Sequence, residues 1–141
     1  MTILDDTNTV LQAKGSAGGA GLGGEYLVDA FGCRPDSLRS RALLDALIGQ
    51  LIRELALVSI GQPQWHEFPG HGGVTGLILL TESHIAIHTF PEHAAATFNL
   101  YCCRNRREWP WQERLTELLG ATEVQVRRVI RGGRGHPFPR L

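Results

Sequence analysis

The sequence predicts an α+β fold, a two-layer sandwich in which an antiparallel β-sheet carries helices on one face. Strand-like runs follow one another closely between residues 74 and 103. Such short connections join antiparallel neighbours, because a parallel pair needs a crossover of a dozen residues or more. Two helical segments, around 37–55 and 110–120, can pack on the sheet. With 141 residues, 43% of them hydrophobic, the chain has the size of one domain with a single core.

Two segments of biased composition flank the predicted domain. Residues 1–23 are polar and then glycine-rich, without the period of a helix or a strand, so we expect a flexible N-terminal arm. The single domain spans residues 24–131. Residues 132–141 form a C-terminal tail that is rich in Gly, Pro and Arg.

The first ordered elements are a strand and a long helix. Residues 25–31 form a strand-like run that Gly32 and Pro35 close. A helix then begins with Asp36 or Ser37 as its N-cap. Apolar residues recur along it at helical spacing: Leu44, Leu47, Ile48, Leu51, Ile52 and Leu55. This pattern predicts an amphipathic helix that lies over the sheet.

Four strand candidates follow the long helix. They span residues 58–68, 74–81, 84–90 and 95–103. Gly61 and Pro63 interrupt the first candidate, and a Pro-Gly-rich turn over residues 69–73 ends it. The second candidate is apolar on both of its faces, which predicts a central place in the sheet.

The chain ends with a second helix and a last strand. The helix starts near Pro110, a favoured first-turn position, and ends at Gly120, a favoured C-terminal cap. Residues 123–131 form the last strand. The predicted order is therefore strand, helix, four strands, helix, strand.

Strand alternation separates the reactive side chains by face. His84 and His88 point to one face of their strand, and the isoleucines between them point to the other, under the helices. On the next strand, the apolar set includes Cys102, which places this thiol in the core. Cys103 then shares the face of the two histidines. Cys33, like Cys102, is expected to be a packing residue.

The three cysteines indicate a reducing compartment. An odd number of cysteines, two of them adjacent, does not make a disulfide framework. No apolar run approaches the length of a membrane span, and the first residues lack a basic segment followed by an apolar one. We expect a cytoplasmic protein without a membrane partner.

The charge of the chain argues against nucleic-acid binding, and the spacing of possible ligands argues against a metal site. Residues 104–141 hold nine Arg and four Glu, a surplus of five positive charges, yet the whole chain has a formal net charge of zero. No aromatic platform is interleaved with these arginines, so nucleic-acid binding is not predicted. His84, His88 and Cys103 could be considered as metal ligands. The chain lacks a C-x-x-C or H-E-x-x-H pair, however, and we expect no metal site.

Three segments carry a specific resemblance to a known family. They are Gly73-Val74-Thr75-Gly76, the string E-S-H-I-A-I-H-T-F-P-E from Glu82 to Glu92, and Cys103. Together they resemble the bacterial and archaeal S-adenosylmethionine decarboxylase proenzymes, and the similarity extends from about Gly24 to Val129. The resemblance implies a self-processing, pyruvoyl-dependent enzyme that makes decarboxylated S-adenosylmethionine for spermidine synthesis.

The resemblance also implies how the chain is processed. The Ser83 hydroxyl attacks the Glu82 carbonyl, and an elimination then frees the upstream chain and turns Ser83 into the pyruvoyl cofactor. Cleavage between residues 82 and 83 divides the 141 residues into chains of 82 and 59. His88 corresponds to the family histidine that assists processing by proton transfer. Thr75 stands where the family usually has Ser, and it keeps the hydroxyl.

The resemblance also implies roles for residues that act on the substrate after processing. The pyruvoyl ketone forms a Schiff base with the substrate amine and accepts the electrons released as carbon dioxide leaves. Cys103 corresponds to the proton donor, a role that suits a thiol because it is mostly protonated at neutral pH yet acidic enough to donate. Glu92 corresponds to the carboxylate that binds the ribose hydroxyls, and Phe68 to an aromatic that stacks on adenine. The family relationship implies a homodimer of cleaved protomers.

Several positions depart from the family pattern. Phe90 replaces a usual Trp, and Asn99 replaces a usual Asp. The segment His93-Ala94-Ala95 replaces a Tyr-Gly-Tyr type segment, and Arg104 follows Cys103 where Gly is common. Some members of the superfamily decarboxylate arginine or ornithine, so these remain alternative substrates. A third alternative is a homologue that stays uncleaved and has a non-catalytic role.

Overall fold

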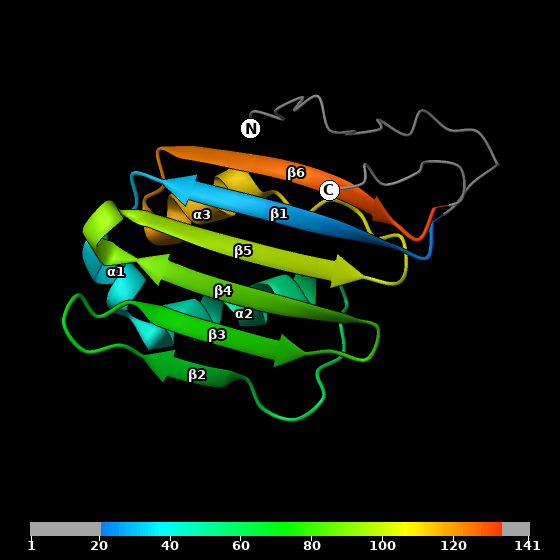
Figure 1. The fold of residues 1–141 in the computed structure, drawn as a ribbon, viewed down its shortest axis with the longest axis horizontal. Coiled ribbons are helices and arrows are strands. Elements are labelled where there is room, and N and C mark those ends of the chain that lie inside the picture. The colour runs from blue at the N-terminus through cyan, green and yellow to red at the C-terminus, as the bar shows by residue number, and fades with distance from the viewer. Residues whose placement is uncertain (1–20, 134–141) are drawn as a thin grey trace, which may run out of the picture.

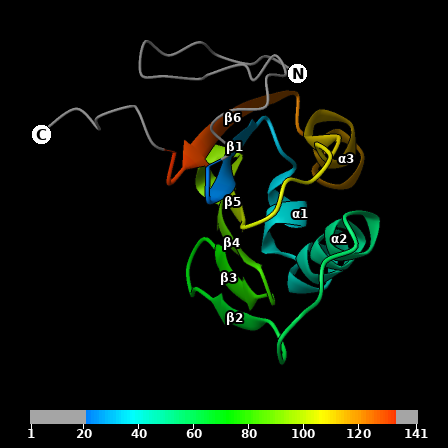
Figure 2. The same ribbon diagram turned by 90° about the vertical axis from the view of Figure 1, so that its right-hand side faces the viewer.

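The computed structural model describes residues 21–133. It contains a six-stranded sheet with the strand order β2-β3-β4-β5-β1-β6, in which all neighbouring strands are antiparallel. Helices α1, α2 and α3 all lie on one face of this sheet (Figures 1 and 2). The predicted α+β two-layer sandwich is therefore confirmed. Most of the predicted N-terminal arm (1–23) and C-terminal tail (132–141) lies outside the described residues.

The elements follow the predicted order, except that a short 3-10 helix is added and the first helix is divided in two. The strands are β1 Gly23–Phe31, β2 Gln64–Glu67, β3 Val74–Leu79, β4 Ser83–Phe90, β5 Ala95–Cys102 and β6 Glu123–Arg131. The helices are α1 Pro35–Arg39, α2 Arg41–Glu54 and α3 Trp111–Leu119, with a short 3-10 helix, η1, at Pro91–His93. Gly120 ends α3 in the left-handed conformation, with φ of 71°, as its predicted role as a C-terminal cap requires.

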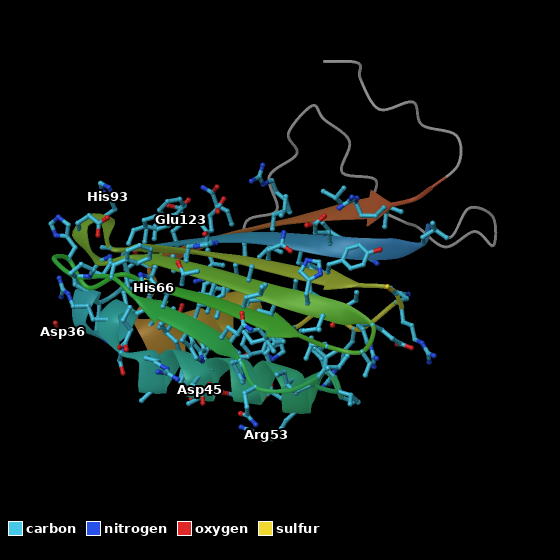
Figure 3. The ribbon with its side chains drawn as sticks, turned by 60° about the horizontal axis from the view of Figure 1, so that its bottom comes forward. Asp36, Asp45, Arg53, His66, His93 and Glu123 are labelled. Atoms are coloured by element: carbon cyan, nitrogen blue, oxygen red, sulfur yellow. The ribbon has the colours of Figure 1, made fainter. Side chains whose placement is uncertain are left out.

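The long helix predicted to start at Asp36 or Ser37 is divided in two. The break is at Ser40, whose backbone is extended (φ −86°, ψ 95°) and whose hydroxyl accepts a hydrogen bond from the Leu43 N–H at 3.2 Å. Ser40 is therefore the N-cap of α2, since a serine hydroxyl satisfies a free N–H of the first turn. Asp45 and Arg53 lie on the outer side of α2, away from the sheet (Figure 3).

Two strand predictions need correction. Within the predicted strand 58–68 only β2 pairs continuously, because Gly61 has a positive φ of 69° and Pro63 cannot donate a ladder hydrogen bond. Strand β3 is not central, since it lies between the edge strand β2 and β4. Its second apolar face is open to solvent, where Leu77 and Leu79 are 49% and 57% exposed.

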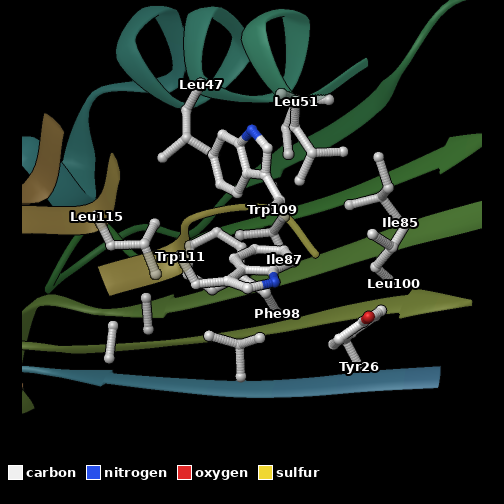
Figure 4. Packing of buried hydrophobic residues seen from close by; sticks show 14 of the residues in the cluster. Tyr26, Leu47, Leu51, Ile85, Ile87, Phe98, Leu100, Trp109, Trp111 and Leu115 are labelled. Carbon is white, nitrogen blue, oxygen red and sulfur yellow. The ribbon is translucent and has the colours of Figure 1, made fainter. Parts of the chain in front are cut away.

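The core lies between the sheet and the helices. Trp109 and Trp111 are 1% and 0% exposed and meet edge to face, with ring centroids 4.9 Å apart. Leu47 and Leu51 of α2 cover these rings from the helix side, and Ile87 meets them from the sheet (Figure 4). Burial of apolar side chains of this size is the main source of stability for a domain of this length.

The two glycines of the Gly73-Val74-Thr75-Gly76 segment have a packing reason in this chain. A Cβ on Gly73 would lie 2.7 Å from the backbone oxygen of Thr89, and one on Gly76 would lie 2.4 Å from the Trp65 ring. Only glycine allows β3 to approach β4 and the Trp65 ring so closely. These contacts fix Thr75, which lies between them.

Candidate active site

Ser83 begins β4 directly after a tight turn from β3. The Leu80 N–H donates to the Ser83 carbonyl at 3.0 Å, which closes the turn. The Thr81 N–H donates to the Val58 carbonyl at 2.9 Å, and the Cys103 N–H donates to the Glu82 carbonyl at 2.8 Å. The bond between residues 82 and 83 is thus held from both sides by neighbouring segments.

The Ser83 side chain points to the helix face of the sheet. The residue is 7% exposed, and its hydroxyl makes no hydrogen bond of ordinary geometry within the described residues 21–133, although it lies close enough to the Cys102 thiol to act against the rise in that thiol's pKa. It is paired across the ladder with Cys102 and lines a small cavity with Glu82, Arg104 and Arg106. A buried hydroxyl without a partner is costly for folding, and it is free to act as a nucleophile.

The two adjacent cysteines have different surroundings, as alternation predicted. Cys102 is 5% exposed, and burial raises the pKa of its thiol. Cys103 is exposed and lies near the Tyr101 ring; burial of that ring and the neighbouring Cys103 thiol raise the pKa of Tyr101. Because the Tyr101 ring stacks on His84 at 5.5 Å, Cys103 is on the side of the predicted histidine face.

Thr75 and His88 form a second polar pair on the open face of the sheet. They are direct partners between β3 and β4, and Thr75 Oγ1 lies 3.1 Å from His88 Nδ1. This distance fits a hydrogen bond. The resemblance had linked both residues to processing, and the structure brings their side chains together.

The structure does not bring His88 to Ser83 within one chain. They are five residues apart on one strand, which corresponds to roughly 17 Å at about 3.3 Å per residue. Their side chains also point to opposite faces of β4, since Ser83 is buried on the helix side and His88 is exposed on the other. We call Glu82, Ser83 and Cys103 the Ser83 group.

The remaining predicted residues lie at the other end of the sheet. Glu92 is in η1, which follows the end of β4. Phe68 follows β2, where its N–H donates to the Gly73 carbonyl at 2.8 Å, and it is 50% exposed. A Cβ on Gly73 would be 3.6 Å from Pro91, so the β2–β3 turn and η1 are close. We call Phe68, Thr75, His88 and Glu92 the His88 group.

A groove of about 440 Å³ crosses the open face of the sheet between these groups. Its wall includes Glu25, whose carboxylate accepts hydrogen bonds from Asn99 and Arg131, both at 2.6 Å. Burial acts to raise the pKa of Glu25, but these two bonds outweigh it and the pKa is lowered. Sequence analysis did not single out Glu25 and Arg131; alternation along 25–31 could have placed Glu25 on the face of His84.

Neither a metal cluster nor a membrane helix is present in the part of the chain that the structure describes. Over residues 21–133, no group of three or more His, Cys, Asp or Glu side chains is arranged to hold a metal ion. No helix in the same range is long and apolar enough to cross a membrane.

Comparison with known proteins identifies the family. A family model described as S-adenosylmethionine decarboxylase matches residues 24–132, which is most of the chain. The chain belongs to the S-adenosylmethionine decarboxylase family. The resemblance stated from the motifs is thereby confirmed.

Relatives within the S-adenosylmethionine decarboxylase family match over most of their length. An S-adenosylmethionine decarboxylase proenzyme from Hydrogenobaculum sp. is 37% identical over 112 residues, covering 79% of this chain and 82% of the relative. One from Caldicellulosiruptor saccharolyticus is 31% identical over 120 residues, covering 79% and 89%. The crystal structure of the adenosylmethionine decarboxylase from Aquifex aeolicus has a TM-score of 0.68 and 25% identity, covering 85% of this chain and 98% of that one.

Proposed function

We propose that this chain is a self-processing, pyruvoyl-dependent S-adenosylmethionine decarboxylase. Family membership supports the reaction class. The observation that carries the proposal to this chain is the Ser83 turn, where a buried hydroxyl without a partner adjoins a peptide bond whose carbonyl accepts the Cys103 N–H at 2.8 Å. The proposed substrate is S-adenosylmethionine, and the location is the cytoplasm.

The first chemical step is an attack by Ser83 on its own peptide bond. Its Oγ bonds to the Glu82 carbonyl carbon, negative charge develops on the carbonyl oxygen, and the C–N bond breaks to leave an ester. The Cys103 N–H already donates to that oxygen, so it stabilises the developing charge in the manner of an oxyanion hole. An elimination then releases the upstream chain at Glu82 and leaves the pyruvoyl group at residue 83.

Proton transfer during processing is assigned to His88, with Thr75 as its partner. The Thr75 hydroxyl lies 3.1 Å from Nδ1, so it orients the ring and leaves Nε2 available for the reacting group. The methyl group that Thr adds relative to Ser does not prevent this contact. The roughly 17 Å between His88 and Ser83 along β4 supports an arrangement in which the two residues come from different chains.

A homodimer would bring Ser83 of one protomer and His88 of the other together. The sheet face opposite the helices exposes Leu77, Leu79 and Phe90 at 49%, 57% and 38%, and a second copy packed there would bury them. A two-fold axis reverses the strand direction of the second copy. The Ser83 group of each protomer would then lie beside the His88 group of its partner, which makes two equivalent sites.

Turnover of substrate depends on residues from both groups. The pyruvoyl group supplies a carbonyl that condenses with the substrate amine and takes up the electron pair released with carbon dioxide. Cys103 is exposed next to residue 83 and donates the proton that replaces the carboxylate. Glu92 binds the ribose hydroxyls, and Phe68, half exposed, stacks on the adenine.

Measurement of carbon dioxide release from S-adenosylmethionine, arginine and ornithine tests which of these compounds is the substrate.

Denaturing mass spectrometry tests self-processing. The purified chain is expected to yield two fragments, of 82 and 59 residues, in place of the intact 15.5 kDa chain, and the smaller fragment should begin with a pyruvoyl group. Ser83→Ala should remain intact, because it lacks the nucleophile. An unsubstituted chain that stays intact after long incubation would show that this homologue is not a pyruvoyl enzyme.

A further inference from the structure

Two arginines from the loop after β5 meet the side chain of Glu82. Arg104 Nε lies 2.8 Å from Glu82 Oε2, and Arg106 Nη2 lies 3.8 Å from the same oxygen. Both arginines also line the small cavity that Ser83 lines. Two guanidinium groups therefore contact the side chain of Glu82, the residue whose peptide bond is expected to break.

The loop that carries these arginines is held in place independently of Glu82. Arg106 Nη1 donates to the Leu55 carbonyl at 3.3 Å, and Arg107 Nη2 donates to the Glu54 carbonyl at 2.6 Å. These carbonyls belong to the C-terminal end of α2, where cations are favoured. Among the described residues 21–133, Arg104 has no such anchor, and its side chain is 71% exposed. An exposed ion pair of this kind contributes little to folding stability. We therefore consider a role for the contact between Arg104 and Glu82 in the chemistry of self-processing.

The charges at this position balance only after cleavage. Before the reaction, two guanidinium groups face the single Glu82 carboxylate. When the ester breaks, Glu82 becomes a chain terminus and acquires a second carboxylate beside the first. Resting on the proposed function, we propose that Arg104 and Arg106 stabilise this leaving carboxylate and so accelerate the elimination step of self-processing.

The step balances with solvent water as its one further reactant. The His88 imidazole assigned to processing takes the Cα proton of residue 83, and the C–H electrons form a Cα–Cβ double bond. The Cβ–Oγ bond breaks, and its electron pair leaves on the Glu82 carboxylate. The unsaturated amine left at residue 83 takes up a solvent water and releases ammonia, which gives the pyruvoyl group. Fixed cations near a departing anion lower the barrier to its departure.

The test separates ester formation from elimination. Hydroxylamine cleaves an ester but not a peptide bond, and it would give a 59-residue fragment that begins with serine, whereas complete processing gives one that begins with a pyruvoyl group. The R104Q/R106Q double variant should form pyruvoyl fragment about tenfold more slowly and should accumulate the hydroxylamine-sensitive ester. R104K/R106K keeps both charges and should process at close to the normal rate.

Arg107→Gln is the matched control, because Arg107 anchors the same loop without touching Glu82. It should not accumulate ester. Normal processing by the double Gln variant, or slowing without a hydroxylamine-sensitive species, would overturn the proposal; equal ester in Arg107→Gln would also overturn it.

A second measurement needs no variant. Raising the salt concentration to about 1 M shortens the screening length to about 3 Å and should increase the trapped ester in the unsubstituted chain, and an unchanged amount would count against the proposal. A lack of any cleavage in the unsubstituted chain at low salt would instead overturn the proposed function on which it rests.

Discussion

Cys102 and Cys103 are adjacent in the chain, but they lie in different chemical environments. Cys102 is the last residue of β5 and is buried under the helices, whereas Cys103 is exposed beyond the strand end. The Cys103 N–H also holds the Glu82 carbonyl. In the proposed function, the Cys103 backbone acts in processing and its thiol acts in turnover. These two roles can be tested separately, because a side-chain substitution leaves the N–H in place.

Cys103→Ala is expected to leave self-cleavage unaffected and to lower the rate of decarboxylation by about 10²–10⁴-fold, the usual contribution of a positioned proton donor. The two readouts are fragment formation by mass spectrometry and carbon dioxide release. Cys33→Ala is the matched control, because it removes a buried thiol away from residue 83; it should cost on the order of 1 kcal/mol of stability and retain turnover. Loss of cleavage in Cys103→Ala would contradict the separation of roles.

At the scale of elements, the 3-10 helix η1 ends under strain. Ala94 caps it with φ of 49° and ψ of 37°, the left-handed region that costs a residue with a Cβ about 1 kcal/mol or more. The family usually has a glycine in this segment, and its physical reason is now apparent. The segment also carries Glu92, so its conformation positions a predicted substrate contact.

Ala94→Gly should therefore stabilise the protein by about 1 kcal/mol. Urea unfolding in a Ser83→Ala background, which keeps the chain in one piece, measures the change. Ala46→Gly is the control, because Ala46 is exposed in the middle of α2 and a glycine there should destabilise by about 1 kcal/mol. Equal losses in both variants would show that the conformation of Ala94 is not strained.

A second element-scale feature is the link between β1, β5 and β6 through Glu25, Asn99 and Arg131. Asn99 donates a hydrogen bond to the Glu25 carboxylate, which an ionised Asp at this position could not do. The pKa of Glu25 is lowered below its ordinary value of 4.5. The ionised form is therefore favoured by folding, and the stabilisation is present above this value and disappears as the pH falls through the lower folded-state pKa.

Glu25→Gln should consequently destabilise the protein at pH 7 by about 1 kcal/mol or less, and the difference from the parent should shrink as the pH is lowered below about 4. Urea unfolding at a series of pH values in the Ser83→Ala background measures it. Glu67→Gln, at an exposed position of the edge strand β2, is the control and should show little difference at any pH. A difference for Glu25→Gln that stays constant with pH would rule out ionisation as its cause.

At the scale of the whole molecule, the two site groups lie at opposite ends of one sheet. The Ser83 group is where β4 begins, and the His88 group is where it ends. All three helices cover the same face (Figure 2), so both ends can meet a second copy across the open face. The proposed dimer would therefore contain two equivalent sites, each completed by residues of both protomers.

Mixing two inactive variants tests this arrangement. Ser83→Ala and His88→Ala chains should each stay uncleaved alone. In a heterodimer, the Ser83→Ala chain supplies an intact His88 to the other chain, so the His88→Ala chain should be cleaved, which its mass identifies. A double Ser83→Ala/His88→Ala chain is the control and should not rescue cleavage. An uncleaved mixture that contains heterodimers would place both residues in one chain.

The sequence by itself determined the fold class, the element order and the faces of the reactive side chains. Alternation placed Cys102 inside and Cys103 outside, because the two-residue period of a strand is local geometry. The family motifs pointed to Ser83 and His88, because a motif is a pattern of residues that are neighbours in the chain. The helix break at Ser40 and the short length of β2 were seen only in the structure. Local capping and turns there interrupt a pattern that looks continuous in the sequence.

Only the tertiary structure decided how the site residues are distributed. It showed that Thr75 meets His88, and that Ser83 lines a cavity with Arg104 and Arg106. Such contacts depend on strand order and register between distant segments, which the spacing of residues in one strand does not contain. The motif from Glu82 to Glu92 therefore places its reactive residues at two opposite ends of one sheet.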